Sequence, residues 1–492
     1  MSYDNLMRLA FGRGFFIQSC EIYADTPAGF WEYGPLGTVF RNRFIDLWRK
    51  EIVRRDQMME IDGSQIMSKD VFEASGHLKN FVDPIVSCGK CGLTVRADKL
   101  ISDKIKKIIP ERLTGEEYDV HLKKNRIRCP KCQGEFGKVS KFNMMFRVGV
   151  GATDETAYLR PETCQSIFVD FPRLFKIMRG KLPFSVAQSG KSFRNEISPR
   201  QSLMRLREFY QAEIEVFYNL SRINEFEKFE EVSNYMLRLL IDSQINDVSC
   251  DEALKKSFIP NRLVGYYLAI MQQFYEKVGI DRKNLRFRKL TSDEKAFYAK
   301  SAFDLEVKTS LGWIELVACN DRGDYDLKRH MEFSKKDMMV DDGDDKVLPN
   351  IFELSMGVDR SLYCIMEHSF IKEIDNKKNS RDILKLNRCL SPVQVGIFPL
   401  LKKESLQAKA KEIQNILKGE FHTFYDESGS IGRRYRRQDE VGTPLGITID
   451  YGTLNDNEVT LRNRDDMDQK RVKITELLQI IRGYFLDEDS FR

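Results

Sequence analysis

Alternating polar and apolar positions between Lys191 and Val216 predict two antiparallel strands joined by a loop. On the incoming strand Arg194 and Glu196 lie two residues apart, so their side chains point to the same face. The returning strand combines an apolar face with a polar face that carries an aromatic ring, an amide and carboxylates. This polar face consists of Phe209, Gln211, Glu213 and Glu215. The combination suits a phosphate, a purine and an ammonium group bound side by side; a solvated sheet edge with incidental ion pairs is the alternative.

A second alternating segment covers residues 351–356 and is followed by an apolar helix over 358–367. Glu353 and Ser355 share one face of this strand, while aromatic and aliphatic side chains fill the other face. Arg360 lies in the first turn of the helix. The pattern therefore predicts a carboxylate, a hydroxyl and a guanidinium near one pocket, unless Arg360 only pairs with its neighbouring aspartate or with solvent.

A third strand is predicted over residues 312–318, where Trp313, Glu315 and Val317 are expected to share a face. We expect Glu315 to lie in apolar surroundings, where an isolated carboxylate is unfavourable. Mg²⁺ brought in by a nucleotide would neutralise it, and so would a nearby arginine.

A turn and a helix start are predicted between Tyr158 and Gln165. Pro161 fixes the turn and Glu162 begins the helix. Arg160 and Glu162 are then able to face the same cavity, which adds another carboxylate to the candidate site.

Helical periodicity is clearest after a turn rich in glycine and proline at residues 29–37, where large apolar side chains recur on one face. These side chains are Phe40, Phe44, Leu47 and Trp48. Ordinary core packing explains such a stripe. The segment 217–300 is predicted to be mostly helical, and residues 384–392 resemble a linker. Beyond it, a strand at 393–400, a helix at 402–417 and a basic turn predict a small α/β domain.

The composition narrows the class of protein. A length of 492 residues indicates about two to four domains. An apolar content of 42% with 31% charged residues is typical of a soluble globular enzyme. No apolar run is long enough for a membrane span and the N-terminal residues lack a secretory core, so a cytoplasmic protein is expected. The net charge of +5 requires that any nucleic acid be bound by local basic patches.

Two Cys-x-x-Cys pairs lie in an insertion at residues 85–140. Their spacing predicts a tetrahedral site of four thiolates that holds a structural zinc ion, with a small helix between the pairs. The ligands would be Cys88, Cys91, Cys129 and Cys132. A redox pair would need only one such motif at a helix start, and unmetalled buried thiols are the other alternative. The scattered cysteines are expected to be buried thiols, namely Cys20, Cys164, Cys250, Cys319, Cys364 and Cys389.

Taken with these motifs, the chain resembles the class II aminoacyl-tRNA synthetases, and among them the homodimeric glycyl-tRNA synthetase family of archaea, eukaryotes and some bacteria. Motif 1 corresponds to residues near 29–55, motif 2 to 191–216 and motif 3 to 351–368. Residues 73–78 and 158–163 match hallmarks of the glycine enzymes, and 431–444 match their anticodon-binding domain. The resemblance covers nearly the whole chain, and motif 1 implies a homodimer.

The fold implied by this resemblance is of the α/β (α+β) class. It has an antiparallel-sheet catalytic core at residues 1–84 and 141–383 and a zinc-ribbon-like insertion at 85–140. A mostly helical insertion at 217–300 lies within the core, and a C-terminal α/β anticodon-binding domain follows at 390–492.

The resemblance also implies the roles of individual residues. Arg194 and Arg360 would be catalytic, and Glu315 would hold Mg²⁺ that enters with ATP. ATP would be bound by Arg194, Asn195, Glu196, Arg205, Leu206, Phe209, Glu315, Leu316 and Arg360. Glycine would be bound by Glu162, Glu213, Glu353, Leu354, Ser355 and Arg96. The chain departs from the family pattern at Leu354, where proline is usual, and at Ala318, Cys319 and Asn320, where a glycine-containing sequence is usual.

A basic cluster with an aromatic ring marks the expected tRNA-binding surface of the C-terminal domain. It contains Arg433, Arg434, Tyr435, Arg436 and Arg437. Arginines can neutralise phosphates while the ring stacks on an unpaired base. A solvated turn with ordinary charges is the alternative.

The implied activity is ATP-dependent activation of glycine and its transfer to tRNA-Gly. Two other classes stay open on the sequence alone. A non-catalytic nucleic-acid-binding accessory protein on the same scaffold would lack the ATP arginines and the pocket carboxylates. A class II synthetase for threonine, proline or histidine would lack the pocket of three carboxylates.

Overall fold

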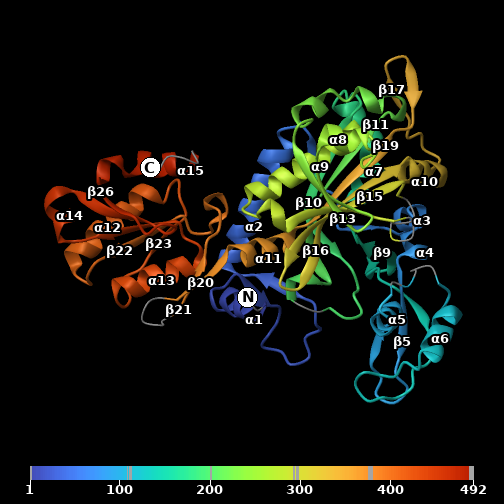
Figure 1. The fold of residues 1–492 in the computed structure, drawn as a ribbon, viewed down its shortest axis with the longest axis horizontal. Coiled ribbons are helices and arrows are strands. Elements are labelled where there is room, and N and C mark those ends of the chain that lie inside the picture. The colour runs from blue at the N-terminus through green and yellow to red at the C-terminus, as the bar shows by residue number, and fades with distance from the viewer. Residues whose placement is uncertain are drawn as a thin grey trace.

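The computed structural model of the chain describes residues 3–107, 109, 113–199, 202–291, 294, 299–374 and 380–486. A large sheet covered by helices forms the core, an elongated insertion projects from one end, and a smaller α/β unit lies beside the core (Figure 1). Across these ranges, no helix combines the length and the apolarity needed to cross a bilayer.

The central sheet has the strand order β13-β12-β14-β15-β16-β19-β11-β10-β3 within the described residues. In that part of the chain its neighbouring strands pair antiparallel, except that β10 pairs parallel with β3 and β12 pairs parallel with β14. The predicted motif 2 hairpin is β10 and β11, and the antiparallel core is confirmed. The strands are β3 (Met59–Ile61), β10 (Phe184–Phe193), β11 (Glu208–Tyr218), β12 (Met236–Ile241), β13 (Gln244–Ser249), β14 (Leu285–Lys289), β15 (Ser301–Thr309), β16 (Gly312–Gly323) and β19 (Asn350–Gly357).

The two faces of this sheet have different coverings. On one face Ile214 and Leu354 pack into an apolar core with α2 (Pro35–Trp48), α9 (Arg262–Lys277) and α11 (Val358–Ser369). On the other face Phe217 and Ile351 pack with α7 (Cys164–Ile177) and α10 (Tyr325–Ser334). Because side chains alternate along β11 and β19, the carboxylates of these strands lie on the α7 face.

The predicted motif 1 helix is confirmed as α2, and Phe40 and Phe44 are fully buried in the larger core. α1 (Tyr3–Gly12), β1 (Phe16–Gln18) and β2 (Trp31–Tyr33) precede it. Gly37 is required here because a Cβ atom at this position would lie 1.9 Å from the Phe15 carbonyl oxygen. The close approach fixes the turn before α2 against the N-terminal strand.

The cysteine-containing insertion forms a small unit with its own apolar core, which includes Val86, Ile101 and Tyr118. It has two helices within its described residues rather than the one expected. Its elements are β5 (Val82–Ser87), β6 (Thr94–Arg96), α5 (Ala97–Ile105), α6 (Gly115–Lys124) and β7 (Ser140–Asn143). Elements on either side of it connect it to the core: β4 (Ile66–Ser68), α3 (Lys69–Ala74), α4 (His77–Asn80), β8 (Arg147–Val150) and β9 (Glu155–Leu159).

The prediction of a mostly helical segment at 217–300 is wrong. α8 (Cys250–Lys255) and α9 lie there, but β12, β13 and β14 extend the central sheet from the same segment. Leu237 and Leu239 are fully buried while Arg238 between them is partly exposed, which is the alternation of a strand. The prediction missed it because the strands are short and charged residues interrupt them. Residues 292, 293 and 295–298 of this segment lie outside the described ranges.

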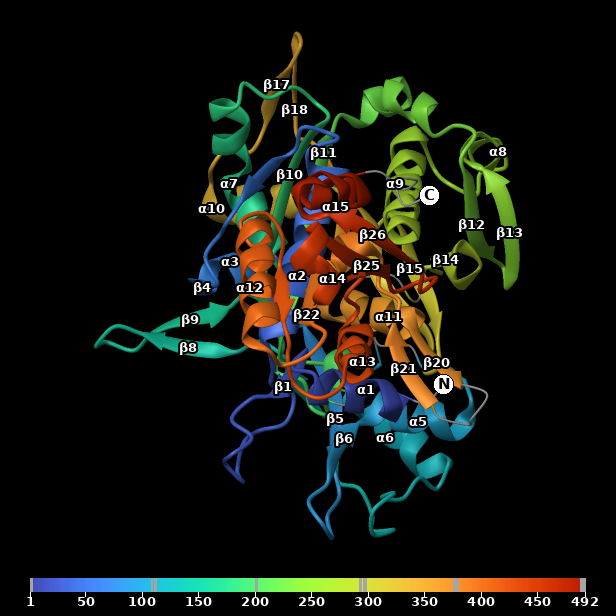
Figure 2. The same ribbon diagram turned by 90° about the vertical axis from the view of Figure 1, so that its left-hand side faces the viewer.

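The C-terminal unit has the predicted α/β character. Its sheet has the order β23-β22-β24-β25-β26 in the described residues, and Figure 2 shows its helices beside that sheet. The predicted strand and helix are present as β22 and α12, but the predicted basic turn is a helix, α13. The elements are β22 (Val395–Pro399), α12 (Glu404–Leu417), β23 (Thr423–Tyr425), α13 (Ile431–Val441), β24 (Leu445–Ile449), α14 (Tyr451–Asp456), β25 (Glu458–Asn463), β26 (Gln469–Lys473) and α15 (Leu477–Leu486).

The segment expected to be a linker is packed against both units. Leu384, Leu386 and Leu390 are fully buried in the larger core. Arg464, which is 3% exposed, donates hydrogen bonds to the carbonyl oxygens of Leu384, Leu386 and Gly442. The C-terminal unit is therefore attached through a buried, hydrogen-bonded connection.

The scattered cysteines are buried with two exceptions. Cys164, Cys250, Cys319 and Cys364 are buried, as predicted, whereas Cys20 is exposed and Cys389 is half-buried. Cys20 lies in the surface loop between β1 and β2, which explains the difference for that residue.

Candidate active site

A cavity of about 240 Å³ lies over the centre of the main sheet. Residues from motif 2, β16, β19 and the segments before α7 and α11 meet there, so the structure brings together predicted site residues from distant parts of the chain. Its lining residues are Glu162, Arg194, Glu196, Leu203, Met204, Arg205, Leu206, Phe209, Tyr210, Gln211, Glu315, Ala318, Asn320, Glu353, Ser355, Gly357, Asp359 and Arg360.

Strand register arranges one end of the cavity as two rows of side chains across β11, β19 and β16. The first row consists of the cross-strand neighbours Glu213, Ser355 and Ala318. The second row consists of Glu215, Glu353 and Asn320. Side chains two residues apart on a strand share a face, so both rows lie on the α7 face of the sheet. Carboxylates from two strands are thus concentrated at one end of the cavity.

Glu213 is 1% exposed and is held by donors on both of its oxygens. Oε2 accepts hydrogen bonds from the Thr163 backbone N–H at 2.7 Å and from Thr163 Oγ1 at 2.6 Å. Oε1 accepts from Ser355 Oγ at 2.5 Å and from Gln211 Nε2 at 3.2 Å. The carboxylate is therefore fixed in orientation before any ligand arrives.

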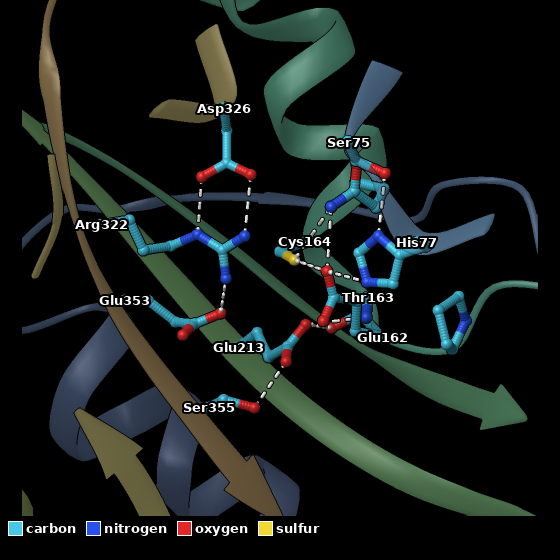
Figure 3. Close-up of polar contacts among 12 residues, drawn as sticks. Ser75, His77, Glu162, Thr163, Cys164, Glu213, Arg322, Asp326, Glu353 and Ser355 are labelled. Carbon is cyan, nitrogen blue, oxygen red and sulfur yellow. Dashed lines mark hydrogen bonds and ion pairs between the residues drawn. The ribbon is translucent and has the colours of Figure 1, made fainter. Parts of the chain in front are cut away.

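Glu162 comes from the turn before α7 and pairs with His77, which the sequence analysis gave no role (Figure 3). His77 Nε2 lies 3.3 Å from Glu162 Oε1, and the other ring nitrogen lies 2.8 Å from Ser75 Oγ. Gln165 Nε2 donates to the same Oε1 at 2.9 Å, and the Cys164 thiol donates to it at 3.1 Å. His77 belongs to the hallmark segment 73–78, and that was the available signal.

Glu353 is held by Arg322, a second residue that the sequence analysis missed (Figure 3). Arg322 is 1% exposed and donates to Glu353 Oε1 at 2.7 Å. It also forms a bidentate pair with Asp326, at 2.7 and 2.8 Å. Asn320 Nδ2 donates to the other Glu353 oxygen at 2.7 Å. The i, i+4 spacing of Arg322 and Asp326 was visible in the sequence, but its connection to Glu353 was not.

The crowding of these carboxylates shifts their ionisation. Burial and the charge of Glu353 raise the pKa of Glu215 well above its ordinary value. Burial raises the pKa of Glu353 to about 7, although the Arg322 guanidinium opposes the shift. Burial and the charge of Glu162 also raise the pKa of Glu213. Burial acts in the same direction on Glu162, but His77 and Arg322 hold the pKa of that residue well below its usual value. A cation entering this end of the cavity would relieve the repulsion.

Arg194 also lines the cavity, and protein contacts hold it in a defined position. Its Nε donates to the Pro161 carbonyl oxygen at 3.0 Å. Its guanidinium carbon lies 5.5 Å from the centre of the Phe81 ring and 5.3 Å from that of Phe209. Nearby, Arg205 Nε donates to Glu196 Oε2 at 2.6 Å. The motif 2 side chains Arg194, Glu196, Arg205 and Phe209 therefore line the same cavity.

Glu315 differs from the prediction. Its side chain is 46% exposed, and Arg360 Nη1 lies 3.5 Å from its carboxylate, so an arginine provides the countercharge. Leu305 pairs with Val317 whereas the next residue, Glu306, pairs with Glu315, so Leu316 forms a bulge. The bulge moves Glu315 to the cavity face and Val317 into the core, and the two do not share a face as expected.

Asp359 connects motif 1 with motif 3. Its carboxylate accepts hydrogen bonds from the Tyr33 hydroxyl and, at 2.6 Å, from the Tyr210 backbone N–H. Burial raises its pKa to about 6 in spite of these donors. The Asp359 carboxylate thus accepts its hydrogen bonds from Tyr33 and Tyr210 and not from Arg360. The structure therefore does not support the alternative in which Arg360 only pairs with its neighbouring aspartate.

Arg96, which was predicted to contact glycine, is not among the residues that line the cavity. Arg96 lies 2.7 Å from an Asp83 oxygen and 2.5 Å from an Asp98 oxygen. These carboxylates pair with it in the insertion.

Four further predicted residues also lie outside the cavity lining. One is Glu213, whose carboxylate accepts a hydrogen bond from Ser355 of the lining. Leu354 is 2% exposed and belongs to the apolar core on the opposite face of β19, because side chains alternate along the strand. The Leu316 side chain is likewise in that core. Asn195 donates its backbone N–H to the Met144 carbonyl oxygen at 2.8 Å, which ties motif 2 to the segment that follows the insertion.

The four cysteines of the insertion come together as one cluster of free thiols. Cys88 Sγ lies 3.5 Å from Cys132 Sγ, and Cys91 Sγ lies 3.6 Å from Cys129 Sγ. All four sulfur atoms lie within 4.8 Å of one another. A Cβ atom at Gly134 would lie 3.0 Å from Cys88 Sγ, so glycine leaves room for the sulfur. The arrangement is compatible with a tetrahedral metal ion.

The predicted tRNA-binding cluster is only partly exposed, because it belongs to helix α13. Arg434 is 2% exposed and donates to the carbonyl oxygens of Pro399, Glu427, Ser428 and Gly429. The Tyr435 ring packs 4.9 Å from that of Phe398, and its hydroxyl lies 2.8 Å from Thr448 Oγ1. Arg437 pairs with Asp426 at 2.5 Å. Of the predicted cluster, Arg433 and Arg436 are exposed.

Replacing Arg434 with alanine is expected to lower the free energy of unfolding by about 3 kcal/mol, because buried carbonyl groups lose their donor. Thermal unfolding of the full chain is the measurement. The matched change Arg433→Ala, on an exposed arginine of the same helix, is expected to change the free energy by less than about 0.5 kcal/mol. Equal effects of the two changes would contradict the structural role of Arg434.

Two domains of the chain match known families. Residues 146–369 match the tRNA synthetase class II core domain (G, H, P, S and T). Residues 394–484 match the anticodon binding domain. The first range contains the cavity strands and the second contains α13, so the two matches coincide with the two units of the fold.

Similar proteins extend the match to nearly the whole chain. The chain is 36% identical to the glycine–tRNA ligase of Methanococcus maripaludis strain C7, over 98% of this chain and 99% of the relative. It is 37% identical to that of Methanocaldococcus jannaschii, with 98% of each covered, and 36% identical to that of Thermococcus gammatolerans, with 99% of each covered. With this identity over full-length relatives and both domain matches, the chain belongs to the glycine–tRNA ligase family.

Proposed function

We propose that this protein activates glycine with ATP to form glycyl-adenylate and then transfers glycine to the 3′ end of tRNA-Gly. One observation carries the proposal: Glu162 and Glu353 line the same cavity as three arginines and the Phe209 ring, and the Glu213 carboxylate is hydrogen-bonded to Ser355 of that lining. The carboxylates fit an ammonium group, and the arginines with the ring fit a nucleotide.

At the acidic end, Glu162, Glu213 and Glu353 receive the ammonium group of glycine, and Ser355 closes the pocket. Glycine has no side chain, so its charged groups and its small size are the features available for recognition. Charge-assisted hydrogen bonds from the ammonium group to a preorganised set of carboxylates recognise the charge of glycine. We expect larger amino acids to be excluded by lack of room, since Asn320 and Glu353 are fixed by their mutual hydrogen bond.

At the nucleotide end, Arg194 binds the α-phosphate and Phe209 stacks on adenine. Glu196 holds the adenine end and Arg205 contacts phosphates. Arg360 engages the γ-phosphate, which explains why it lies in the first turn of α11 facing the cavity. The backbone carbonyl of Glu315 accepts from Arg360 at 3.4 Å, so motif 3 and β16 act together.

The first reaction needs no general base, because the attacking carboxylate of glycine is already ionised. A carboxylate oxygen forms a bond to the α-phosphorus of ATP, the bond to the β-phosphate side breaks, and pyrophosphate leaves. The contribution of the protein is to align the two groups and to stabilise the charge that develops on the phosphate. Arg194 is the residue positioned for that stabilisation.

Mg²⁺ would enter with ATP and would be held by Glu315, with Asp304 close by. The donor set fits a hard cation: burial and the charge of Glu315 raise the pKa of Asp304 to about 7, which is the behaviour of closely spaced carboxylates. When bound, Mg²⁺ neutralises charge on the phosphates of ATP.

A structural zinc ion would be held by Cys88, Cys91, Cys129 and Cys132. Four thiolates leave no open position for a substrate, so the ion stabilises the insertion. Met144, which follows strand β7 of the insertion, accepts a hydrogen bond from the Asn195 N–H of motif 2. Loss of zinc is therefore expected to disturb the active site indirectly.

Replacing Cys132 with serine is expected to remove about one zinc ion per chain, measured by metal analysis of the purified protein. The insertion should become sensitive to proteases while the central core keeps its unfolding transition, because the insertion has a separate apolar core. Cys250→Ser, which changes a buried thiol elsewhere, should retain zinc. An unchanged zinc content in Cys132→Ser would contradict the four-thiolate site.

The partners are ATP, glycine and tRNA-Gly, and the active form is a homodimer built on motif 1. The exposed arginines Arg433 and Arg436 of α13 are the part of the basic cluster able to contact tRNA. A cytoplasmic location stays a prediction from the sequence.

The test is amino-acid-dependent exchange of pyrophosphate into ATP, followed by aminoacylation of tRNA-Gly. Exchange is expected with glycine and not with alanine, serine, threonine, proline or histidine. Exchange with another of these amino acids would identify a different class II specificity. Nucleic-acid binding without exchange of any kind would favour a non-catalytic accessory protein.

A further inference from the structure

We propose that His77 is a positioning residue for glycine, which holds the Glu162 carboxylate ionised and oriented so that one of its oxygens is ready for the ammonium group. His77 is not among the residues that line the cavity, whereas Glu162 is, so His77 acts through Glu162. The inference rests on the proposed function, because its effect is measured in glycine-dependent exchange.

The contacts of Glu162 differ from those of the other two carboxylates of the site. As far as the described residues go, the protein groups that reach Glu162 all meet the same oxygen, Oε1. They are His77 Nε2 at 3.3 Å, Gln165 Nε2 at 2.9 Å and the Cys164 thiol at 3.1 Å (Figure 3). The other two carboxylates accept hydrogen bonds from the protein on both oxygens. Glu162 is therefore the carboxylate that keeps an oxygen, Oε2, available to a ligand.

The His77 ring is itself fixed in place. It is 7% exposed, and its Nδ1 lies 2.8 Å from Ser75 Oγ. The rings of Phe72 and Phe81 pack edge-on against it, with centres at 6.1 and 5.6 Å. Because the Ser75 hydroxyl occupies Nδ1, Nε2 is the nitrogen left to donate to Glu162.

His77 lies at the root of the cysteine-containing insertion, and the same segment also reaches Arg194. The centre of the Phe81 ring, just before β5, lies 5.5 Å from the Arg194 guanidinium carbon. Asn143, at the end of β7, donates to the Leu78 carbonyl oxygen at 2.9 Å and so holds this segment against the insertion. One short segment thus contacts both the carboxylate proposed for the ammonium group and the arginine proposed for the α-phosphate.

The electrostatics give the direction of the effect. Burial raises the pKa of Glu162, but His77 and Arg322 hold it well below its ordinary value. Without His77 the pKa of Glu162 should rise, so a higher pH is needed to ionise the carboxylate. Other titratable and charged groups surround this pair, namely Arg322 from β16, Glu213 from β11, Glu353 from β19, Cys164 from α7 and His330 from α10.

Two variants separate the donor from the ring. His77→Gln keeps an N–H donor without the ring, whereas His77→Phe keeps a ring that can pack against Phe72 and Phe81 but has no nitrogen. In His77→Phe, kcat/KM for glycine should fall by about 10- to 100-fold, the usual effect of losing a hydrogen bond to a charged group. The fall should be smaller in His77→Gln, and the KM for ATP should stay unchanged in both.

His121→Gln is the matched control and should behave as the wild type, because His121 lies in α6 of the insertion and is not among the residues that line the cavity. If His77 served only to pack the rings, His77→Phe would be the more active of the two His77 variants. That order of activities would overturn the proposal.

The pH dependence is a measurement that a packing role would leave unchanged. In His77→Phe the pH at which kcat/KM for glycine is half-maximal should move upward from that of the wild type. Part of the lost activity should therefore return at alkaline pH. A loss by the same factor at every pH would contradict a role through the ionisation of Glu162.

A double-variant cycle keeps the test independent of how His77→Phe folds. Since His77 acts through Glu162, His77→Gln should lower kcat/KM for glycine much less in a Glu162→Gln background than in the wild type. Equal factors in both backgrounds would refute the inference. Absence of glycine-dependent exchange in the wild type would instead refute the proposed function, whereas an active wild type with a fully active His77→Phe would refute the inference alone.

Discussion

Replacing Arg194 with alanine is expected to lower kcat for glycine-dependent pyrophosphate exchange by about 10²- to 10³-fold, the usual effect of removing one preorganised donor at a developing oxyanion. The reason lies in how this side chain is held. The Pro161 carbonyl accepts from its Nε, and the centres of the Phe81 and Phe209 rings lie 5.5 and 5.3 Å from its guanidinium carbon. The positive charge is therefore in place before the phosphate becomes more negative.

The controls for Arg194 separate charge from shape. Arg194→Lys keeps the charge but loses the planar fork of donors, so its activity should fall between that of the wild type and that of the alanine variant. Arg147→Ala removes an exposed arginine on β8 and should leave exchange unchanged. The proposed role of Arg194 would be wrong if the alanine variant, correctly folded by its thermal unfolding, kept kcat within a few-fold of the wild type.

Replacing Glu213 with glutamine is expected to lower kcat/KM for glycine by about 10²- to 10³-fold, since losing one partner of a buried charge pair costs about 2–5 kcal/mol. The amide has nearly the same shape: its oxygen can still accept from Thr163, and its nitrogen can donate to the Ser355 hydroxyl. What is lost is the negative charge that faces the ammonium group. The measurement is exchange as a function of glycine concentration at saturating ATP.

The Glu213→Gln change should lower kcat/KM for glycine only, and this makes the test of Glu213 specific. The KM for ATP should change little, because Glu213 is at the acidic end of the cavity. Glu208→Gln is the matched control: Glu208 begins the same strand, pairs with Lys191 and lines a different cavity. A rise in the KM for ATP without a change for glycine would exclude Glu213 as an ammonium ligand.

Local patterns predicted much of the site correctly because strand alternation is a local property. Glu213 and Glu215 share a face of β11, and Glu353 and Ser355 share a face of β19. Arg360 lies in the first turn of α11, as the strand-to-helix pattern indicated. In each case the repeat of two residues in a strand, or of 3.6 residues in a helix, decides which way a side chain points. Neighbouring residues in the sequence are enough to recognise such a repeat.

The wrong predictions share a different cause. Glu315 and Val317 were expected to share a face, but a bulge at Leu316 breaks the alternation, and the bulge depends on the pairing of β15 with β16. The basic cluster at 433–437 was interpreted as a turn because its many charged residues obscure the helical periodicity, although Arg434 and Tyr435 pack against the rest of the domain. Arg96 was expected at the pocket, but it pairs with Asp83 and Asp98 and is not among the residues that line the cavity.

The sequence by itself determined the family, the strands and helices that carry the motifs, and the faces on which most of the carboxylates lie. Tertiary structure alone decided that His77 holds Glu162, that Arg322 and Asn320 hold Glu353, and that Cys164 lies among these carboxylates. These contacts join residues from β16, β19, α4 and α7. They form only when the sheet brings distant segments together, and no spacing along the chain encodes them.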